Sequence, residues 1–320
     1  MPRRRAVNRA SSPDAPTIYR RSAWGAGGCQ PRAAPAHGSV GVAFVHHTVS
    51  ANDYAPDDVP AMILAICRYH RNSNGWNDIG YNFLVDRFGR LWEGRAGGVD
   101  EAVIGAHAQG FNAQSTGISN LGDFTSAGQS DDALRAMAQL IRWKLPLHGS
   151  PTSGTTTLVS AGGASNRWRY GTSVRFDRVS GHRDADATSC PGDALYAQLP
   201  ALRERVGAVE PAPAGPRPAV TMDEPAKRVK AGRLLAVAGT IDPFKSYVTI
   251  AIDKRAPDRW RSYRRIPIGV AADGTFAKKL RLRERGHYRV FARFSGDGEN
   301  GPARSAVYRV RVPPPNPQPH

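Results

Sequence analysis

The chain has 320 residues, of which 40% are hydrophobic and 22% are charged, and its formal net charge is +17. This length predicts two domains rather than one, with enough apolar residues for packed cores. No apolar run reaches the roughly 20 residues that a membrane-spanning helix needs, which argues against a helical membrane protein.

The positive charge is uneven, because residues 219–320 hold 21 Lys and Arg against 9 Asp and Glu, a net charge of +12. Such a surface favours a polyanionic partner, namely nucleic acid, anionic lipid or an acidic cell wall, although it also serves solubility alone. The sequence lacks the motifs typical of zinc fingers or RNA-binding sheets, so we expect no nucleic-acid partner.

The N-terminus begins Met1-Pro2-Arg3-Arg4-Arg5, and no apolar segment follows it. Residues 1–17 are therefore predicted to form a flexible basic arm and not a complete signal peptide. The route of any export is left open.

From residue 18 to about residue 206 the pattern is mixed α/β. Residues 40–45 form a short apolar run typical of a strand, and His46 is expected where that strand ends. Asp57 or Asp58 can cap a helix that ends near residue 72. The apolar side of this helix is predicted to comprise Val59, Met62, Ile63, Ile66 and Tyr69.

Further elements follow in chain order. Residues 80–85 and 91–93 are predicted strands joined by a turn, and residues 116–122 are another strand. Ser130 can cap a helix from residue 131 to about residue 145, which Pro146 should end. Residues 150–169 are rich in Ser, Thr, Gly and Asn and are interpreted as a surface excursion, with a hairpin as one option. A last helix is predicted at residues 193–206.

Residues 208–218 are rich in Pro and are predicted to be an extended linker. Beyond the linker the apolar period changes to two. The predicted strands are residues 219–222, 233–240, 246–254, 259–270, 275–284, 286–295 and 304–312. About seven short strands predict an all-β immunoglobulin-like sandwich at residues 219–312. The Pro-rich tail, residues 313–320, is expected to be disordered.

The side chains that suggest chemistry are His46 and His47, and then His182 and Cys190 more than a hundred residues later. Imidazole and thiolate are ligands that zinc prefers. Structural zinc sites usually have four protein ligands, whereas catalytic sites keep one position open, so two His and one Cys indicate hydrolysis. Taken singly, each of these residues is more often a packing or surface residue. The remaining cysteines, Cys29 and Cys67, are either a disulfide or two buried thiols.

These residues and several motifs resemble the peptidoglycan recognition protein family, also called type 2 N-acetylmuramoyl-L-alanine amidases. The resemblance covers about residues 18–205, with the motifs in the family's order. They are Arg21-Ser22-Ala23-Trp24-Gly25-Ala26, Phe44-Val45-His46-His47-Thr48, Gly75-Trp76-Asn77-Asp78-Ile79-Gly80-Tyr81-Asn82-Phe83-Leu84-Val85, Trp92-Glu93-Gly94-Arg95, Gly105-Ala106-His107 and the segment Gly181–Gly192. The resemblance implies a domain at residues 18–207 with a mixed central sheet flanked by helices.

The resemblance also implies that His46, His182 and Cys190 hold Zn²⁺. Family members that only bind peptidoglycan typically lack the first His or replace the Cys, and this chain retains both. His47 neighbours His46, but side chains alternate along a strand, so we expect His47 to point away and to serve packing.

Tyr81 matches the family's catalytic tyrosine. Zinc lowers the pKa of bound water to about 7, and a nearby phenol can orient that water and donate to the developing oxyanion. Thr188 matches a second catalytic position that is Lys in phage amidases. A threonine offers only a hydrogen bond there, and its alternative role is to cap the turn before Cys190. Asp184 and Asp186 are interpreted as a solvent-facing charged loop, with a role as partners of the metal ligands as the alternative.

Four residues are expected to bind substrate. His107 is expected to line the groove. Gly75 and Trp76, together with Arg95, accompany a preference for meso-diaminopimelate in the family, because arginine can bind the extra carboxylate that lysine lacks. Each has a simpler alternative role: His107 as a turn residue, Trp76 as a core residue and Arg95 as a surface residue.

The sequence therefore predicts a zinc-dependent amidase that cleaves between N-acetylmuramic acid and L-alanine in peptidoglycan and acts outside the cell or in the cell envelope. The basic C-terminal domain is expected to contact anionic wall polymers, or to be an inert appendage. Two alternatives are a module that binds muropeptides without cleaving them and a structural protein stabilised by its His and Cys cluster.

Overall fold

The computed structural model describes residues 16–208, 217–243, 245, 247–257, 260–294, 296 and 300–314. The basic arm up to residue 15, most of the linker and the end of the tail lie outside these residues. The described chain divides into two compact units. One contains residues 31–52 and 69–209, and the other contains residues 19–30, 53–68 and 210–320. No helix among the described residues has the length and apolar character to cross a membrane.

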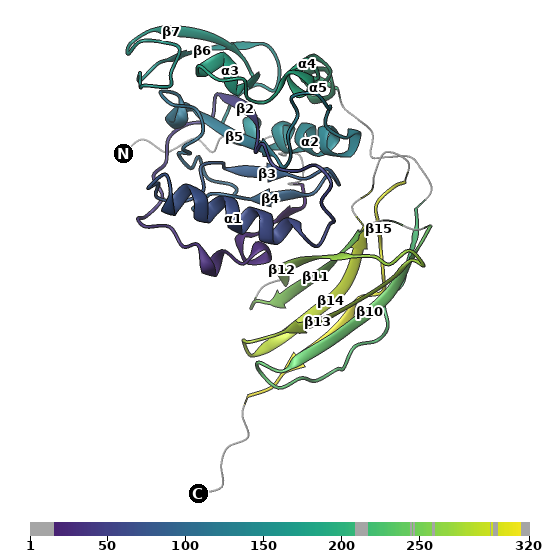
Figure 1. Ribbon diagram of the computed structural model, residues 1–320. Helices are drawn as coiled ribbons and strands as arrows, with labels where there is room; N and C mark the ends of the chain where they lie inside the picture. The colour runs from purple at the N-terminus through teal and green to yellow at the C-terminus, as the bar shows by residue number, and fades with distance from the viewer. Residues whose placement is uncertain are drawn as a thin grey trace, which may run out of the picture. The chain divides into compact units, whose positions relative to one another are not determined.

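A six-stranded mixed sheet forms the centre of the first half of the chain (Figure 1). Its order is β1 (Ile18–Tyr19), β4 (Leu91–Glu93), β3 (Phe83–Val85), β5 (Ser115–Asn120), β2 (Val42–His47) and β8 (Val179–Gly181). β2 is parallel to both β5 and β8, β3 is parallel to β5, and β4 is antiparallel to β3. The predicted mixed sheet is confirmed, and β2 continues two residues beyond its predicted end.

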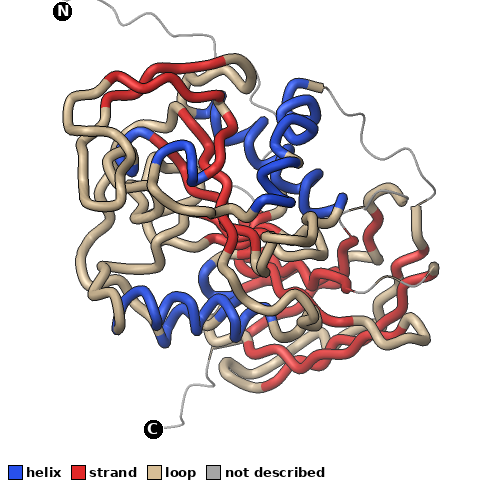
Figure 2. The backbone as a smooth tube through the Cα atoms, turned by 45° about the horizontal axis from the view of Figure 1, so that its top comes forward, coloured by secondary structure: helices blue, strands red, loops and turns tan. Residues whose placement is uncertain are grey.

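Helix α2 (Asp131–Leu147) lies against one face of this sheet, with α5 (Leu199–Gly207) beside it (Figures 1 and 2). The hydroxyl of Ser130 accepts a hydrogen bond from Ala133 N–H and so caps α2 as predicted. The expectation that Pro146 ends the helix is wrong, because Pro146 lies in the last turn and the helix continues to Leu147.

Two other helix predictions need correction. The helix expected at residues 193–206 is divided into α4 (Asp193–Ala197) and α5, with Pro200 in the first turn of α5. Helix α1 (Val59–Asn72) has the predicted bounds, but Tyr69 is 60% exposed. The buried side of α1 consists of Val59, Ile63, Cys67 and His70. On this side, Cys67 forms a disulfide with Cys29, which answers the question left open for these cysteines.

The excursion at residues 150–169 contains the first strand of a hairpin, β6 (Thr155–Val159), paired with β7 (Ser173–Asp177). Leu158 and Phe176 of the hairpin join Phe44 of β2 in a hydrophobic cluster. Ala43 and Val45 of β2 instead belong to the cluster beneath α2. The hairpin therefore covers the sheet face opposite α2, and this second face carries the candidate site. The short helix α3 (His182–Ala185) follows β8 directly.

The C-terminal part is all β, as predicted. One sheet has the order β13 (Thr275–Arg281), β10 (Leu234–Asp242) and β9 (Ala219–Val220). The other has the order β12 (Trp260–Gly269), β11 (Tyr247–Arg255), β14 (Gly286–Phe294) and β15 (Ala303–Arg304), and β16 (Tyr308–Val312) also pairs with β14. Residues of both sheets share one hydrophobic core. The seventh predicted strand, residues 304–312, is divided into β15 and β16.

Candidate metal centre

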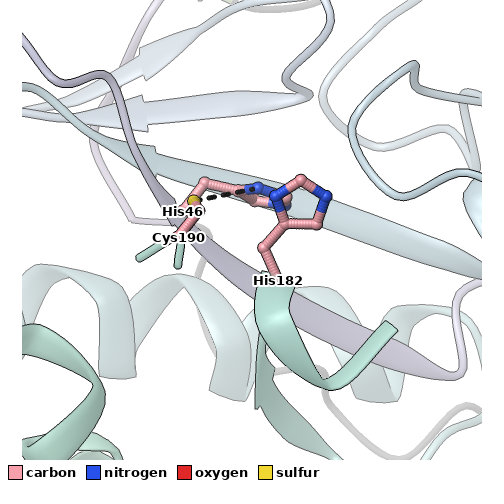
Figure 3. A group of neighbouring side chains, drawn as sticks. All are labelled: His46, His182 and Cys190. Carbon is pink, nitrogen blue, oxygen red and sulfur yellow. Dashed lines mark hydrogen bonds between the residues drawn. The ribbon is translucent and has the colours of Figure 1, made fainter. Parts of the chain in front are cut away.

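The three predicted ligands, His46, His182 and Cys190, come together (Figure 3). His46 is on the same sheet face as Phe44, which is opposite α2. Val45 of β2 pairs with Gly181 of β8, so His182, the residue after β8, lies beside His46. The sulfur of Cys190 accepts a hydrogen bond from His47 N–H at 3.4 Å, which fixes Cys190 against β2. One ligand atom from each of His46, His182 and Cys190 lies within 4.8 Å of the other two.

Strand alternation separates the two adjacent histidines as expected. The Nδ1 atom of His46 lies 3.8 Å from the sulfur of Cys190. The Nδ1 atom of His47 instead accepts a hydrogen bond from Phe124 N–H at 3.2 Å. His47 is therefore outside the cluster, as expected, and its imidazole accepts a structural hydrogen bond.

The Nε2 atoms of the two ligand histidines, His46 and His182, each contact a neighbouring side chain. Nε2 of His46 lies 3.2 Å from Nδ1 of His107, and Nε2 of His182 lies 2.9 Å from a carboxylate oxygen of Asp186. Each ligand histidine consequently has Nδ1 left for the cluster, and contacts of this kind fix the tautomer of a metal ligand.

Asp184 and Asp186 do not form the solvent-facing loop that was expected. Asp186 is 3% exposed and also accepts a hydrogen bond from Gln109 N–H. Asp184 accepts hydrogen bonds from Gly181 N–H at 2.8 Å and from the Tyr196 hydroxyl at 2.6 Å. The correction has a physical cause, because residues 165–167 pair with residues 185–187 and cover this segment.

His107 is buried in a space that two glycines leave open. A Cβ atom at Gly117 would lie 2.5 Å from the His107 ring, and one at Gly105 would lie 2.3 Å from it. Its position is therefore specified by the absence of side chains at both residues. The sequence showed the Gly105-Ala106-His107 motif, but no local signal connected His107 with Gly117 on β5.

In the absence of metal, burial favours neutral imidazoles at His46 and His107 and a protonated thiol at Cys190. Burial, and then the charges of His182 and His107, lower the pKa of His46. Burial also lowers the pKa of His107 to about 3 and raises the pKa of Cys190 to about 12. Neutral imidazole is the form that binds metal, whereas the thiol must lose its proton. Two imidazoles and one sulfur are a donor set that fits zinc.

Tyr81 adjoins the cluster. The centroid of its ring lies 5.3 Å from that of His46 and 5.5 Å from that of His70. Burial, and then the proximity of Cys190, raise the pKa of the Tyr81 hydroxyl, so the phenol keeps its proton at neutral pH. A protonated hydroxyl can donate a hydrogen bond to an oxygen bound at the cluster.

A pocket of about 350 Å³ adjoins the cluster and includes Trp76, His107, His182 and Asp186 in its lining. Trp76 lies against His70, with ring centroids 4.7 Å apart. Two of the residues predicted to bind substrate, His107 and Trp76, therefore line this pocket. The alternative that Trp76 is only a core residue does not hold.

The other predicted site residues lie at varying distance from this pocket. Arg95 is half-buried, its guanidinium donates to Ile79 C=O at 3.3 Å, and it does not line the pocket. Gly75 has a φ of 72° in the turn after α1, a conformation that favours glycine. The hydroxyl of Thr188 accepts a hydrogen bond from Cys190 N–H at 3.1 Å, which is the capping contact considered as its alternative role.

The part of the chain that carries this site is similar to known proteins. A family model described as N-acetylmuramoyl-L-alanine amidase matches residues 35–193. The chain is 32% identical over 202 residues to the human N-acetylmuramoyl-L-alanine amidase, a match that covers 62% of this chain and 30% of that protein. The chain thus spans about a third of the length of the mammalian amidases that it matches.

Smaller relatives are covered more fully. The chain is 30% identical to peptidoglycan-recognition protein SC2 of Drosophila melanogaster over 185 residues, which are 57% of this chain and 84% of that protein. Among solved structures, Drosophila PGRP-LB is 28% identical, with a TM-score of 0.45 over 57% of this chain and 92% of that one. The chain belongs to the family of peptidoglycan-recognition proteins and N-acetylmuramoyl-L-alanine amidases.

Proposed function

We propose that this protein is a zinc-dependent amidase that hydrolyses the bond between N-acetylmuramic acid and L-alanine of peptidoglycan. The observation that carries the proposal is the convergence of His46, His182 and Cys190 within 4.8 Å on one face of the sheet. Three protein ligands are typical of a catalytic zinc site, whereas structural sites usually have four. Bound there, zinc supplies an activated water and a Lewis acid for the amide carbonyl.

The surrounding residues have separate roles in this proposal. His107 and Asp186 orient the two imidazoles through the contacts at 3.2 Å and 2.9 Å. The Tyr81 hydroxyl donates a hydrogen bond to the carbonyl oxygen as negative charge develops on it, which lowers the barrier. Thr188 is assigned the weaker role of fixing the backbone of Cys190, because its hydroxyl oxygen accepts a hydrogen bond from that N–H.

The stem peptide is proposed to bind in the pocket beside the metal centre. Trp76 and His107 supply its apolar and aromatic lining. Arg95, which is outside the lining of this pocket, is proposed to favour meso-diaminopimelate by binding its second carboxylate where the peptide extends beyond the pocket. Arg95 N–H donates to Tyr81 C=O at 2.9 Å, and this bond connects the arginine to the tyrosine of the site. Gly75 forms the turn that presents Trp76.

The finer assignments of the whole chain are also proposals. They are an amidase domain at residues 18–207, an immunoglobulin-like sandwich at residues 219–312 and an action outside the cell or in the cell envelope. Two sheets that share one core support the sandwich. A disulfide between Cys29 and Cys67 supports an oxidising compartment.

The proposal is tested with the full chain, its zinc content measured, acting on purified sacculi. Mass spectrometry should detect peptides with a new N-terminal L-alanine and glycans with free muramic acid. Cys190→Ser is expected to lose most of its zinc and its cleavage, whereas Ser189→Ala should retain both. If the zinc-loaded protein binds sacculi and releases no such ends at neutral pH, the chain is a recognition module.

A further inference from the structure

The C-terminal β unit has a cationic pocket of about 640 Å³ on its five-stranded sheet. Its basic lining residues are Lys227, Arg228, Arg255, His287, Arg309 and Arg311. Trp260 also lines it, and none of the described residues that line it is a carboxylate. These residues belong neither to the metal centre nor to the groove beside it, so the cationic pocket needs its own explanation.

The register of the strands explains why the cations face solvent. Tyr288 of β14 and Val310 of β16 are buried in the core and pair with each other. Successive side chains of a strand point to opposite faces. His287, Arg309 and Arg311 therefore point away from the core.

Pairing between strands then places the cations side by side. Arg255 pairs with Trp260 across β11 and β12, and His287 pairs with Arg311 across β14 and β16. Arg228 forms a bridge with Arg311 on the far side of β16. Neighbouring strands are about 4.8 Å apart. The result is a row of basic side chains that runs across the strands and not along one of them.

The carboxylates nearby neutralise cations other than the arginines of the pocket. Asp253 is paired with both Arg265 and Arg289 at 2.8 Å, and Glu284 is paired with Lys254. Lys227 of the pocket pairs with Glu224 at 3.1 Å.

The four arginines of the pocket, by contrast, form no ion pair with a carboxylate of the described residues. They are Arg228, Arg255, Arg309 and Arg311. Like charges directly opposite one another across strands are destabilising. Arg311 has such a neighbour in Arg228. A bound anion would remove this repulsion.

Trp260 adds a second recognition element. The guanidinium of Arg289 lies 4.7 Å from the centroid of its ring and that of Arg255 lies 5.7 Å from it. These contacts hold the ring beside the row of cations, where it can cover the C–H face of a sugar or polyol. A strand-binding nucleic-acid site uses several rings on which successive bases stack. Tyr288 is buried in the core, so of the tryptophan and tyrosine rings of the lining only that of Trp260 is left for contact, beside the imidazole of His287.

We propose that the cationic pocket binds an extended anionic polymer of phosphodiester-linked sugar or polyol units. The paired N–H groups of a guanidinium can donate two hydrogen bonds to phosphate oxygens. A tetrahedral phosphodiester can also bridge guanidinium groups of neighbouring strands. The row across the strands suits a chain of repeating charges better than a single small anion. The class of polymer is inferred from the pocket alone. That the polymer comes from a cell wall rests on the proposed function, because a wall polymer would hold the enzyme at its substrate.

The test uses the full chain and defined poly(glycerol phosphate), with binding measured by calorimetry at several salt concentrations. Arg255→Gln/Arg311→Gln is compared with Arg233→Gln/Arg283→Gln, which removes the same charge from exposed arginines outside the pocket. The pocket variant should bind at least tenfold more weakly, with a salt dependence reduced by about two charges, and the control less than twofold more weakly. Trp260→Ala should weaken binding of poly(glycerol phosphate) and leave binding of inorganic polyphosphate unchanged.

Three outcomes would overturn the proposal. Equal weakening in both double variants would mean that only the overall field attracts polyanions. Equal or tighter binding of a single-stranded oligonucleotide with the same number of phosphates would identify a nucleic-acid site, and tighter binding of polygalacturonate would identify a carboxylate site. Cleavage of a soluble muropeptide is measured in parallel and should be unchanged in every variant. Loss of the proposed amidase function and loss of polymer binding are thereby distinguished.

Discussion

Nδ1 of His107 lies 3.2 Å from Nε2 of His46, in a space that exists because residues 105 and 117 are glycines. His107 is buried and neutral, and its Nδ1 atom contacts Nε2 of His46. This contact orients the His46 ring so that its other nitrogen, Nδ1, faces the sulfur of Cys190 at 3.8 Å. His107 is therefore a positioning residue for the metal centre as well as part of the groove.

Replacing His107 should weaken zinc binding. We expect His107→Ala to lower zinc affinity about 10- to 100-fold, the usual effect of removing a partner of a ligand histidine. His107→Asn should recover part of the loss, because its amide oxygen can occupy the place of Nδ1. Competition with a chromogenic chelator measures the affinity, and exposed His37→Ala is the control. Unchanged zinc affinity in His107→Ala would contradict the positioning role.

Tyr81 should matter for catalysis and not for metal binding. Removal of one hydrogen-bond donor to a developing oxyanion costs roughly 100- to 1,000-fold in kcat. We expect Tyr81→Phe to lose about that much, with zinc affinity within twofold of wild type. Tyr69→Phe, in an exposed tyrosine of α1, is the matched control. Full activity in Tyr81→Phe would show that the ring only packs against His46.

Arg95 is predicted to select the stem peptide. In wild type we expect kcat/KM for a diaminopimelate muropeptide to exceed that for its lysine counterpart by at least tenfold, since a bidentate contact to a carboxylate is lost with lysine. Arg95→Gln should bring the ratio near one. Arg175→Gln, on exposed β7, should leave it unchanged. Equal rates in wild type would refute the selection, and the melting temperature shows whether loss of the bond to Ile79 C=O disturbs the fold.

The three cluster residues were predicted from the resemblance of their motifs to those of a known family, and the structure brings His46, His182 and Cys190 together. Strand alternation accounts for the separation of His46 from His47. By contrast, the sequence indicated no strand at β8, whose end places His182. The roles of Asp186 and Gly117 could not be obtained this way. Asp186 is buried only because residues 165–167, far away in the sequence, cover it, and Gly117 accommodates a ring from another segment. Such contacts depend on tertiary packing, which periodicity does not report.

A buried charge also escaped the sequence reasoning. Asp86 was placed in a turn, and the structure has it fully buried, where it accepts hydrogen bonds from Arg90 Nε at 2.6 Å and Trp92 Nε1 at 2.9 Å. Breaking a buried pair leaves an uncompensated charge and costs about 3–5 kcal/mol.

Asp86→Asn should consequently lower the melting temperature by roughly 10 °C in calorimetry. Asp177→Asn removes a carboxylate from a surface pair with Arg203 at 3.0 Å, where the expected cost is below about 1 kcal/mol. Similar small shifts in both variants would mean that Asp86 is not needed to neutralise Arg90.

His70 should make folding depend on pH. Burial, and then Arg95, lower its pKa to about 4, while Nδ1 accepts a hydrogen bond from Gly80 N–H at 3.1 Å. The unfolded chain therefore binds a proton near pH 6.5 that the folded chain takes up only near pH 4. Stability from the neutral ring is complete above pH 6.5 and decreases as the pH falls towards 4. At about 1.4 kcal/mol per pH unit, the loss between pH 7.5 and pH 5 is about 2 kcal/mol.

His70→Asn keeps an acceptor for Gly80 N–H and does not titrate, so it should remove about that much of the pH dependence. Urea unfolding with a chelator present, at pH 7.5 and pH 5, measures the difference, and His37→Asn should leave the dependence as it is in wild type. The same slope in His70→Asn and wild type would mean that His70 is protonated in the folded chain, with Gly80 N–H left without its acceptor.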